Sequence, residues 1–238
     1  QDMMTYNLPT SLWAHLKRRQ TDFEYPHSKR ILQQDWFDKR LDRAIQTYNM
    51  DEASVFQIRD VFERIQDWSD EEHISSIVLW RTFDLPWTEL AECVINTINP
   101  TNHDQLSFSE YFQLTCAICM LGKPEMNRIL FKHIDKEGKY LLSEEEFHDG
   151  IEFMTEGLEG QRTVRLWTRM YKKFLDLDTY SMNLNKFHEF MDHNPRVLWC
   201  FLSIQNKFWQ NNLGVDFWER KMKMFKKVRD DLGVVILK

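Results

Sequence analysis

The chain has 238 residues, enough for one large domain or two small ones, and 42% of them are hydrophobic. Its formal net charge of −6 excludes a globally basic surface, so we expect no nucleic acid partner. Glycines number seven and prolines six, which disfavours a turn-rich β fold. We therefore expect an all-α protein whose core is large enough to fold without disulfides or metal.

Four cysteines are present, and two of them, Cys116 and Cys119, form a lone C-x-x-C. No second pair supports a zinc site, and both residues lie in the apolar stretch 114–121, so we interpret them as buried thiols in a reducing compartment. The longest apolar runs fall short of the roughly 20 residues of a membrane span. Residues 1–6 lack a signal-peptide core. We expect no membrane contact.

Apolar residues recur at helical spacing along most of the chain. The predicted helices are Asp35–Tyr48, Ser54–Ile65, Pro86–Thr97, Phe108–Leu121, Glu125–His133, Glu144–Met154, Thr163–Leu175, Lys186–Asp192, Arg196–Trp209 and Asp216–Asp231. Pro86 and Pro124 are placed at helix starts, where a missing N–H costs little. The pattern also repeats, because a polar segment ending in an apolar residue separates successive helices. These apolar residues, at intervals of 32, 36 and 42, are Ile74, Leu106, Leu142 and Leu184.

The polar segment Asp135–Glu146 fits the twelve-position frame of a calcium loop. It places carboxylates at positions 1, 3 and 12 (Asp135, Glu137 and Glu146) and an apolar residue, Leu142, at position 8. With its flanking aromatics, Phe131 and Phe147, it resembles the third EF-hand of calcineurin B, neuronal calcium sensors and calaxin. Three weaker frames lie at Asp67–Val78, Asn99–Glu110 and Asp178–Glu189.

The resemblance implies four degenerate EF-hand units in two pairs, with extra N- and C-terminal helices. The predicted divisions are 1–53 for an N-terminal extension, 54–121 and 122–195 for the two pairs, and 196–238 for a C-terminal helical extension. Each pair is expected to share a short β-bridge, between Ile74 and Leu106 and between Leu142 and Leu184.

The same frames predict poor calcium binding. In the third loop, Lys139 occupies position 5, where an oxygen ligand belongs, and Tyr140 occupies position 6, where glycine allows the turn. The other loops each lack several acidic ligands. Asp135, Glu137 and Glu146 therefore form the one candidate calcium site, and no other cofactor is expected.

We predict a non-catalytic scaffold or adaptor subunit that binds amphipathic helices of protein partners through apolar grooves. Nine tryptophans exceed what a small core usually needs, although each aromatic taken singly favours the core. The candidate partner-binding residues are Trp80, Trp87, Phe112, Trp167, Trp218 and Phe225. The alternative is a calcium-responsive sensor that uses the third loop. Motifs of hydrolases, P-loop proteins, zinc proteases and dinucleotide enzymes are missing, so an enzyme is not expected.

The last predicted helix, Asp216–Asp231, carries one apolar stripe and six cations. We expect it to dock on protein rather than on an anionic membrane, because the whole chain is acidic. The likeness to calaxin suggests a cytoplasmic or cytoskeletal assembly such as the axoneme. The alternative is an accessory subunit of a mitochondrial complex.

Overall fold

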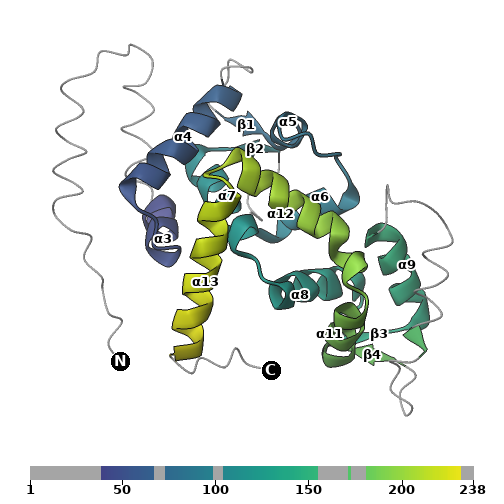
Figure 1. Cartoon of the computed structure of the whole chain (residues 1–238). Coiled ribbons are helices and arrows are strands. Elements are labelled where there is room, and N and C mark those ends of the chain that lie inside the picture. Colours follow the sequence, from purple (N-terminus) through teal and green to yellow (C-terminus); the bar gives the residue numbers. More distant parts are fainter. Residues whose placement is uncertain (1–38, 67–72, 99–103, 155–170, 173–180, 232–238) are drawn as a thin grey trace, which may run out of the picture.

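The computed structural model describes residues 39–66, 73–98, 104–154, 171–172 and 181–231 (Figure 1). Helices dominate these ranges, as expected for an all-α protein. The predicted helix at 163–175 lies outside them except for residues 171–172, of which Tyr171 is helical. The described start of the chain is α3, Lys39–Thr47, within the predicted helix at 35–48.

The first half of the described chain alternates helices with two very short strands. Its elements are α3, α4 (Glu52–Gln66), β1 (Ile74–Ser75), α5 (Ser76–Thr82), α6 (Glu89–Ile98), β2 (Gln105–Leu106) and α7 (Phe108–Met120). The second half repeats this alternation and then ends in helices. Its elements are α8 (Lys123–Ile134), β3 (Leu141–Leu142), α9 (Glu144–Met154), β4 (Met182–Asn183), α11 (Leu184–His193), the 3-10 turn η1 (Pro195–Leu198), α12 (Trp199–Asn211) and α13 (Val215–Asp231).

The first ladder joins β1 and β2 in antiparallel register, with Ile74 opposite Leu106. This is the bridge that the sequence predicts. Both residues are fully buried. The chain enters α7 through a capping box, in which Ser107 Oγ accepts from Glu110 N and the Glu110 carboxylate accepts from Ser107 N.

The second ladder differs from the prediction. Leu142 pairs with Met182, not with Leu184, which is already the first residue of α11. The reason is the helix start: Asn183 is a good N-cap, and its Oδ1 accepts from Lys186 N at 3.0 Å. The strand ends at that cap, so the buried pairing residue is Met182, two positions earlier than predicted.

Aromatic side chains on the two sides of the second ladder contact each other. Phe131, at the end of α8, meets Phe187 of α11, with ring centroids 5.5 Å apart. Phe147, at the start of α9, meets Tyr171 at 4.6 Å. Residues before one strand of the ladder thus contact the helix that follows the opposite strand. Edge-to-face and tilted pairs of this kind add to the stabilisation from area burial alone.

The predicted start of the helix at 86–97 is wrong by three residues. Helix α6 begins at Glu89, and Thr88 supplies the cap, since its Oγ1 accepts from Ala91 N at 3.3 Å. Pro86 lies before the helix. Pro124, by contrast, sits in the first turn of α8 as expected.

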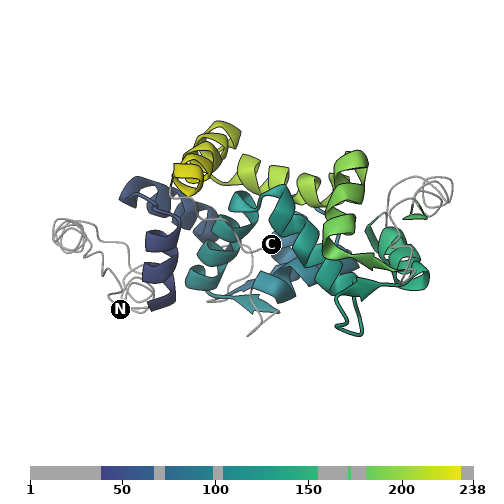
Figure 2. The same cartoon turned by 90° about the horizontal axis from the view of Figure 1, so that it is seen from below.

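The last three helical elements, η1, α12 and α13, lie on one face of the molecule (Figure 2). Helix α12 packs against α7, and α13 packs against both α7 and α12. Helices α3, α4 and α6 also pack against α7, so α7 is the central helix of the first half. Ten of its thirteen residues are buried.

Cys116 and Cys119 are fully buried free thiols on α7, which confirms their predicted burial. Burial raises the pKa of both thiols well above the usual range. Cys93 on α6 is buried too, and its pKa is raised to about 11. Within the described ranges, no helix is both long enough and apolar enough to span a membrane.

Acidification is expected to weaken the contact between α8 and α11. Asn127 is buried on α8, and its Nδ2 lies 3.0 Å from Nδ1 of His188 on α11. Burial lowers the pKa of His188 from its ordinary value of 6.5, Arg128 acts in the same direction, and Asp192 and Glu125 oppose them. The amide donates to an unprotonated ring nitrogen, so the folded state favours the neutral imidazole.

The unfolded chain therefore binds the extra proton more readily, and the free energy of unfolding falls as pH drops through and below 6.5. Urea unfolding at about pH 7.5 and about pH 5.5 measures this difference. The variant His188→Gln should show a smaller difference between the two pH values. The control variant His148→Gln, on α9, should show the same difference as the wild type. An equal difference in wild type and His188→Gln contradicts the assignment.

Candidate functional site

The third polar segment turns around the carboxylate of Asp135. This side chain is almost fully buried, and it accepts hydrogen bonds from Lys139 N at 3.0 Å and from Tyr140 N at 2.7 Å. The turn needs two left-handed residues, Gly138 at φ 66° and Tyr140 at φ 59°. The Asp135 carboxylate therefore holds the turn closed through backbone amides.

The other two predicted calcium ligands of this segment also have partners within the chain. Glu137 forms an ion pair with Lys139, and both side chains are exposed. Glu146 closes a capping box, since its Oε2 accepts from Ser143 N and Ser143 Oγ, each at 2.9 Å. The Oε1 atom of Glu146 is buried and has no hydrogen-bond partner among the described residues.

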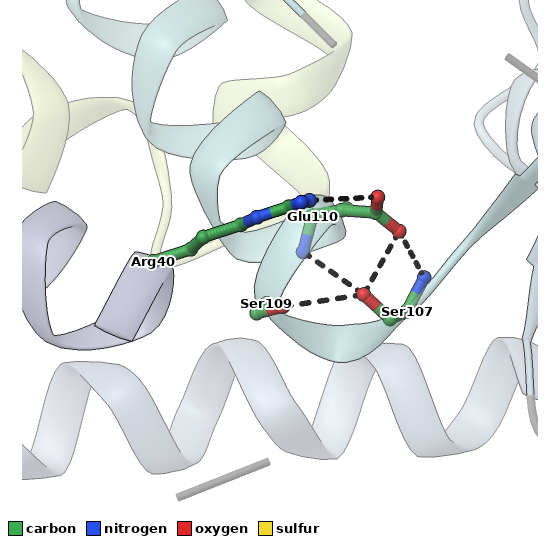
Figure 3. A network of polar contacts seen from close by, with 4 residues as sticks. All are labelled: Arg40, Ser107, Ser109 and Glu110. Carbon is green, nitrogen blue, oxygen red and sulfur yellow. Dashed lines mark hydrogen bonds and ion pairs between the residues drawn. The ribbon is translucent and has the colours of Figure 1, made fainter. Parts of the chain in front are cut away.

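The same box recurs in the second polar segment, with an added cation (Figure 3). Oε2 of Glu110 accepts from Ser107 N and Ser107 Oγ, each at 2.9 Å. Oε1 of Glu110 lies 3.3 Å from NH1 of Arg40, which reaches across from α3. Glu110 is nearly buried while Arg40 is half exposed, so the guanidinium supplies local positive charge beside a buried carboxylate.

These contacts give the candidate metal ligands other roles. Asp135, Glu137 and Glu146 do not converge, and the described residues contain no group of three His, Cys, Asp or Glu side chains placed to hold a metal ion. The carboxylates of the second and third segments cap helices, close a turn or pair with Arg40 and Lys139. Poor calcium binding at the third segment stays a prediction, which measurement must test.

The strained tyrosine allows a stability test. A bulky residue in the left-handed region costs about 1–2 kcal/mol relative to glycine. Tyr140 is 78% exposed, so its side chain contributes little packing. Tyr140→Gly should therefore raise the free energy of unfolding by about 1 kcal/mol in urea titrations.

Gly138 provides the matched control. It has the same backbone conformation, and a Cβ there would meet nothing within 4 Å. Gly138→Ala should therefore lower the free energy of unfolding by about 1 kcal/mol through backbone strain alone. If Tyr140→Gly lowered the free energy of unfolding and Gly138→Ala raised it, backbone strain at these two residues would not explain the stability of the turn.

The predicted partner-binding aromatics divide into buried and accessible residues. Trp80, Phe112 and Trp218 are completely buried within the chain, so they offer no surface in this arrangement. Phe225 on α13 is half-buried. Trp87, in the loop between α5 and α6, is 41% exposed. Trp167 lies outside the described residues.

Helix α12 covers one of these buried residues, Trp80. Its Phe208 packs edge-to-face against Trp80 at 5.4 Å and against Phe83 at 5.0 Å. Next to it, Gln205 Nε2 donates to Ile118 O at 2.9 Å and to Leu121 O at 2.8 Å. These carbonyls lie at and just after the end of α7, where main-chain oxygens have few intrahelical donors.

Trp209 completes the contact, because its Nε1 donates to Cys119 O at 2.9 Å. An apolar anchor and two side-chain caps thus seat one helix of the chain on another. Sequence periodicity places apolar residues on the helix at 196–209, but it does not show which surface they meet.

Helix α13 is fixed by a separate polar contact. Asn212, fully buried between α12 and α13, accepts through Oδ1 from Tyr111 OH at 2.7 Å, and its main-chain oxygen accepts from Trp218 Nε1 at 2.6 Å. Lys221 is also nearly buried, and its ammonium donates to Asn49 O, which ties α13 to the turn after α3. Burial lowers the pKa of Lys221. The helix expected at 216–231 is therefore present, and it packs against other helices of the same chain.

Two exposed apolar residues were missed by sequence reasoning. Trp199, the first residue of α12, is 62% exposed, and Ile77 on α5 is 50% exposed. Trp199 follows Leu198, which is buried. The sequence shows only a tryptophan near the start of a predicted helix. This does not indicate whether its side chain is exposed or buried.

Comparison of the chain with models of known protein families gives no match, and comparison with curated proteins gives none either.

Proposed function

We propose that the chain is a non-catalytic scaffold or adaptor subunit of a larger protein assembly, built on four degenerate EF-hand units in two pairs. The observation that carries the proposal is the seating of α12 on α5 and α7 through Phe208, Gln205 and Trp209. It is a docked amphipathic helix, which is the mode of partner recognition that we propose for the assembly.

The ladders support the EF-hand part of the proposal. If the residues paired across each ladder stand at position 8, Ile74, Leu106, Leu142 and Met182 align the four units. The fourth frame then begins at residue 175, three residues before Asp178, where the sequence analysis places its start. Position 12 becomes Lys186, a cation where a calcium loop has glutamate. Glu189, assigned to position 12 from sequence, instead pairs with Lys186 at 3.0 Å on α11.

Internal cations support calcium independence. Lys139 pairs with Glu137 in the third unit, and Arg40 pairs with Glu110 at position 12 of the second. A calcium ion would have to compete with these charges, and calcium affinity depends on the number of uncompensated oxygen ligands. The buried thiols on α7 do not suggest catalysis, because their pKa values are raised rather than lowered.

One observation favours the alternative, a calcium-responsive sensor. Oε1 of Glu146 is buried and lacks a hydrogen-bond partner among the described residues, and such an acceptor is costly unless something satisfies it. A cation at the third unit would do so. Calorimetric titration of the chain with calcium separates the two functions.

Partner binding is tested on assemblies purified with the tagged full chain from cells that express it, in calcium and in chelator. We expect the same stable partners in both conditions, in a cytoplasmic or cytoskeletal assembly or, alternatively, a mitochondrial complex. The double variant Trp87→Ala/Trp199→Ala should lose partners, because exposed tryptophans are typical interface anchors. Lys186→Ala, a surface change, should retain them. A chain that remains monomeric, or assembles only with calcium, contradicts the proposal.

A further inference from the structure

We propose that the outward face of α12 pairs with the same face of a second copy of this chain. The surface is the neutral line, which we define as Trp199, Ser203, Asn206 and Gln210. These residues follow one another at steps of four, three and four, so they share one side of the helix. Phe201, Ile204 and Phe208 are buried on the opposite side. The inference goes beyond the proposed function, which concerns other proteins as partners.

The neutral line is accessible but carries no charge. Trp199 is 62% exposed, and the other three residues are exposed or half-buried. Lys207 is the one charged residue among the thirteen of α12; it lies to the side of the line and pairs with Asp84 at 3.0 Å. By contrast, ten of the seventeen residues of α13, on the same face of the molecule, are charged (Figure 2). Protein interfaces are depleted in charged residues and enriched in tryptophan, so the composition of the line favours burial against protein.

The line lies on a helix that is anchored from behind. Gln205 donates to carbonyls at the end of α7, and Trp209 donates to Cys119 O. Leu202 and Trp209, both half-buried and packed partly against the core, border the line along one side. The line extends about 17 Å along α12, at 1.5 Å per residue. It therefore offers hydrogen-bonding side chains, one exposed indole and an apolar edge on a fixed support.

The order of residues along the line favours a second copy as the occupant. In an antiparallel pair of α12 helices centred midway along the line, Trp199 lies opposite Gln210 of the second copy. Ser203 in turn lies opposite Asn206. Each hydroxyl then meets an amide, and each indole N–H has an amide oxygen to donate to. A two-fold contact requires a surface that is complementary to itself, and the neutral line meets this requirement.

The charges around the line are compatible with this pairing. A charged line would face its own charge across the two-fold axis, whereas the neutral line has no such repulsion. Lys207 lies opposite Leu202 of the second copy rather than opposite itself. Arg196, exposed in η1, lies beyond one end of the line, so its two copies stand at opposite ends of the pair. A contact through one helix of each copy is small, so we expect a weak, concentration-dependent dimer.

Sedimentation velocity of the purified full chain, from about 1 to about 100 μM, measures self-association. We expect a reversible dimer that is unchanged between about 0.1 and about 0.5 M sodium chloride, because no ion pair holds it. Ser203→Lys/Asn206→Lys should weaken the dimer about tenfold or more, because it places four cations at the centre of the pair. Gln46→Lys/Gln57→Lys adds the same charge at exposed positions of α3 and α4, and it should leave the dimer unaltered.

A charge swap tests the antiparallel register. Ser203→Asp/Asn206→Lys places each introduced carboxylate opposite the introduced ammonium of the other copy, so the dimer should persist and become sensitive to salt. A monomer at every concentration overturns the inference. So does equal weakening of the dimer by the two lysines and by either the charge swap or the control pair. A homodimer that captures no other protein contradicts the proposed function instead, and a monomer that captures partners does the reverse, so the two proposals fail separately.

Discussion

Phe208→Ala is expected to lower the free energy of unfolding by about 3–5 kcal/mol, the usual cost of truncating a fully buried phenylalanine. The side chain is completely buried and forms edge-to-face pairs with Trp80 and Phe83. Its loss leaves a cavity between α12 and α5. Urea unfolding followed by tryptophan fluorescence measures the change, and the dye ANS should report newly exposed apolar surface.

Lys207→Ala is the matched control one residue away. Lys207 pairs with Asp84 at 3.0 Å, and the Asp84 side chain is 93% exposed, so its loss should cost less than about 1 kcal/mol. A cost of less than about 1 kcal/mol for Phe208→Ala would mean that α12 is not seated as described. That result would remove the observation on which the proposed function rests.

Gly150→Ala should destabilise the second half of the chain by about 1–3 kcal/mol, despite the better helix propensity of alanine. Gly150 lies on α9 facing the end of α8. A Cβ there would come within 2.5 Å of Cδ1 and Cγ1 and 2.8 Å of Cγ2 of Ile134. Three atoms of a β-branched, buried side chain cannot all move aside without shifting α8.

The double variant Gly150→Ala/Ile134→Ala tests the stated cause. Alanine at 134 removes all three clashing atoms, so the two changes should together cost less than the sum of their separate costs. Additive costs would show that the loss comes from some other property of Gly150. Thermal or urea unfolding of the four proteins completes the cycle.

Much of the helical pattern could be read from sequence, because amphipathic spacing and caps are local. The helix at 144–154 matches its prediction at both ends, and the one at 108–121 differs by one residue. Ile74 and Leu106 were recognisable as partners because each is an apolar residue just before a helix start. The predicted four-part division of the chain stays a prediction.

The fourth ladder residue was misassigned for an equally local reason. Leu184 is apolar and Met182 is too, so hydrophobicity alone does not choose between them. The choice depends on Asn183, which caps α11 and therefore fixes where the strand ends. Cap chemistry at that residue was the available signal.

The candidate binding aromatics were harder to place because exposure is a tertiary property. Trp80 and Trp199 are both tryptophans on helices, but one is covered by Phe208 and the other is 62% exposed. Arg40 likewise lies 70 positions from Glu110, and no local pattern links them. Contacts of this range come from packing, which a single sequence does not display.

We propose that these helix–loop–helix units are held by the chain's own contacts and act in calcium-independent assembly. Calorimetric titration of the purified full chain with calcium tests it most directly. The variant Lys139→Asp/Tyr140→Gly, which restores an acidic ligand and a glycine to the third loop, should gain a site and shows that the assay can detect one. For the unaltered chain we expect no binding in the micromolar range. A micromolar site that Glu146→Gln abolishes would contradict the account and establish the calcium sensor instead.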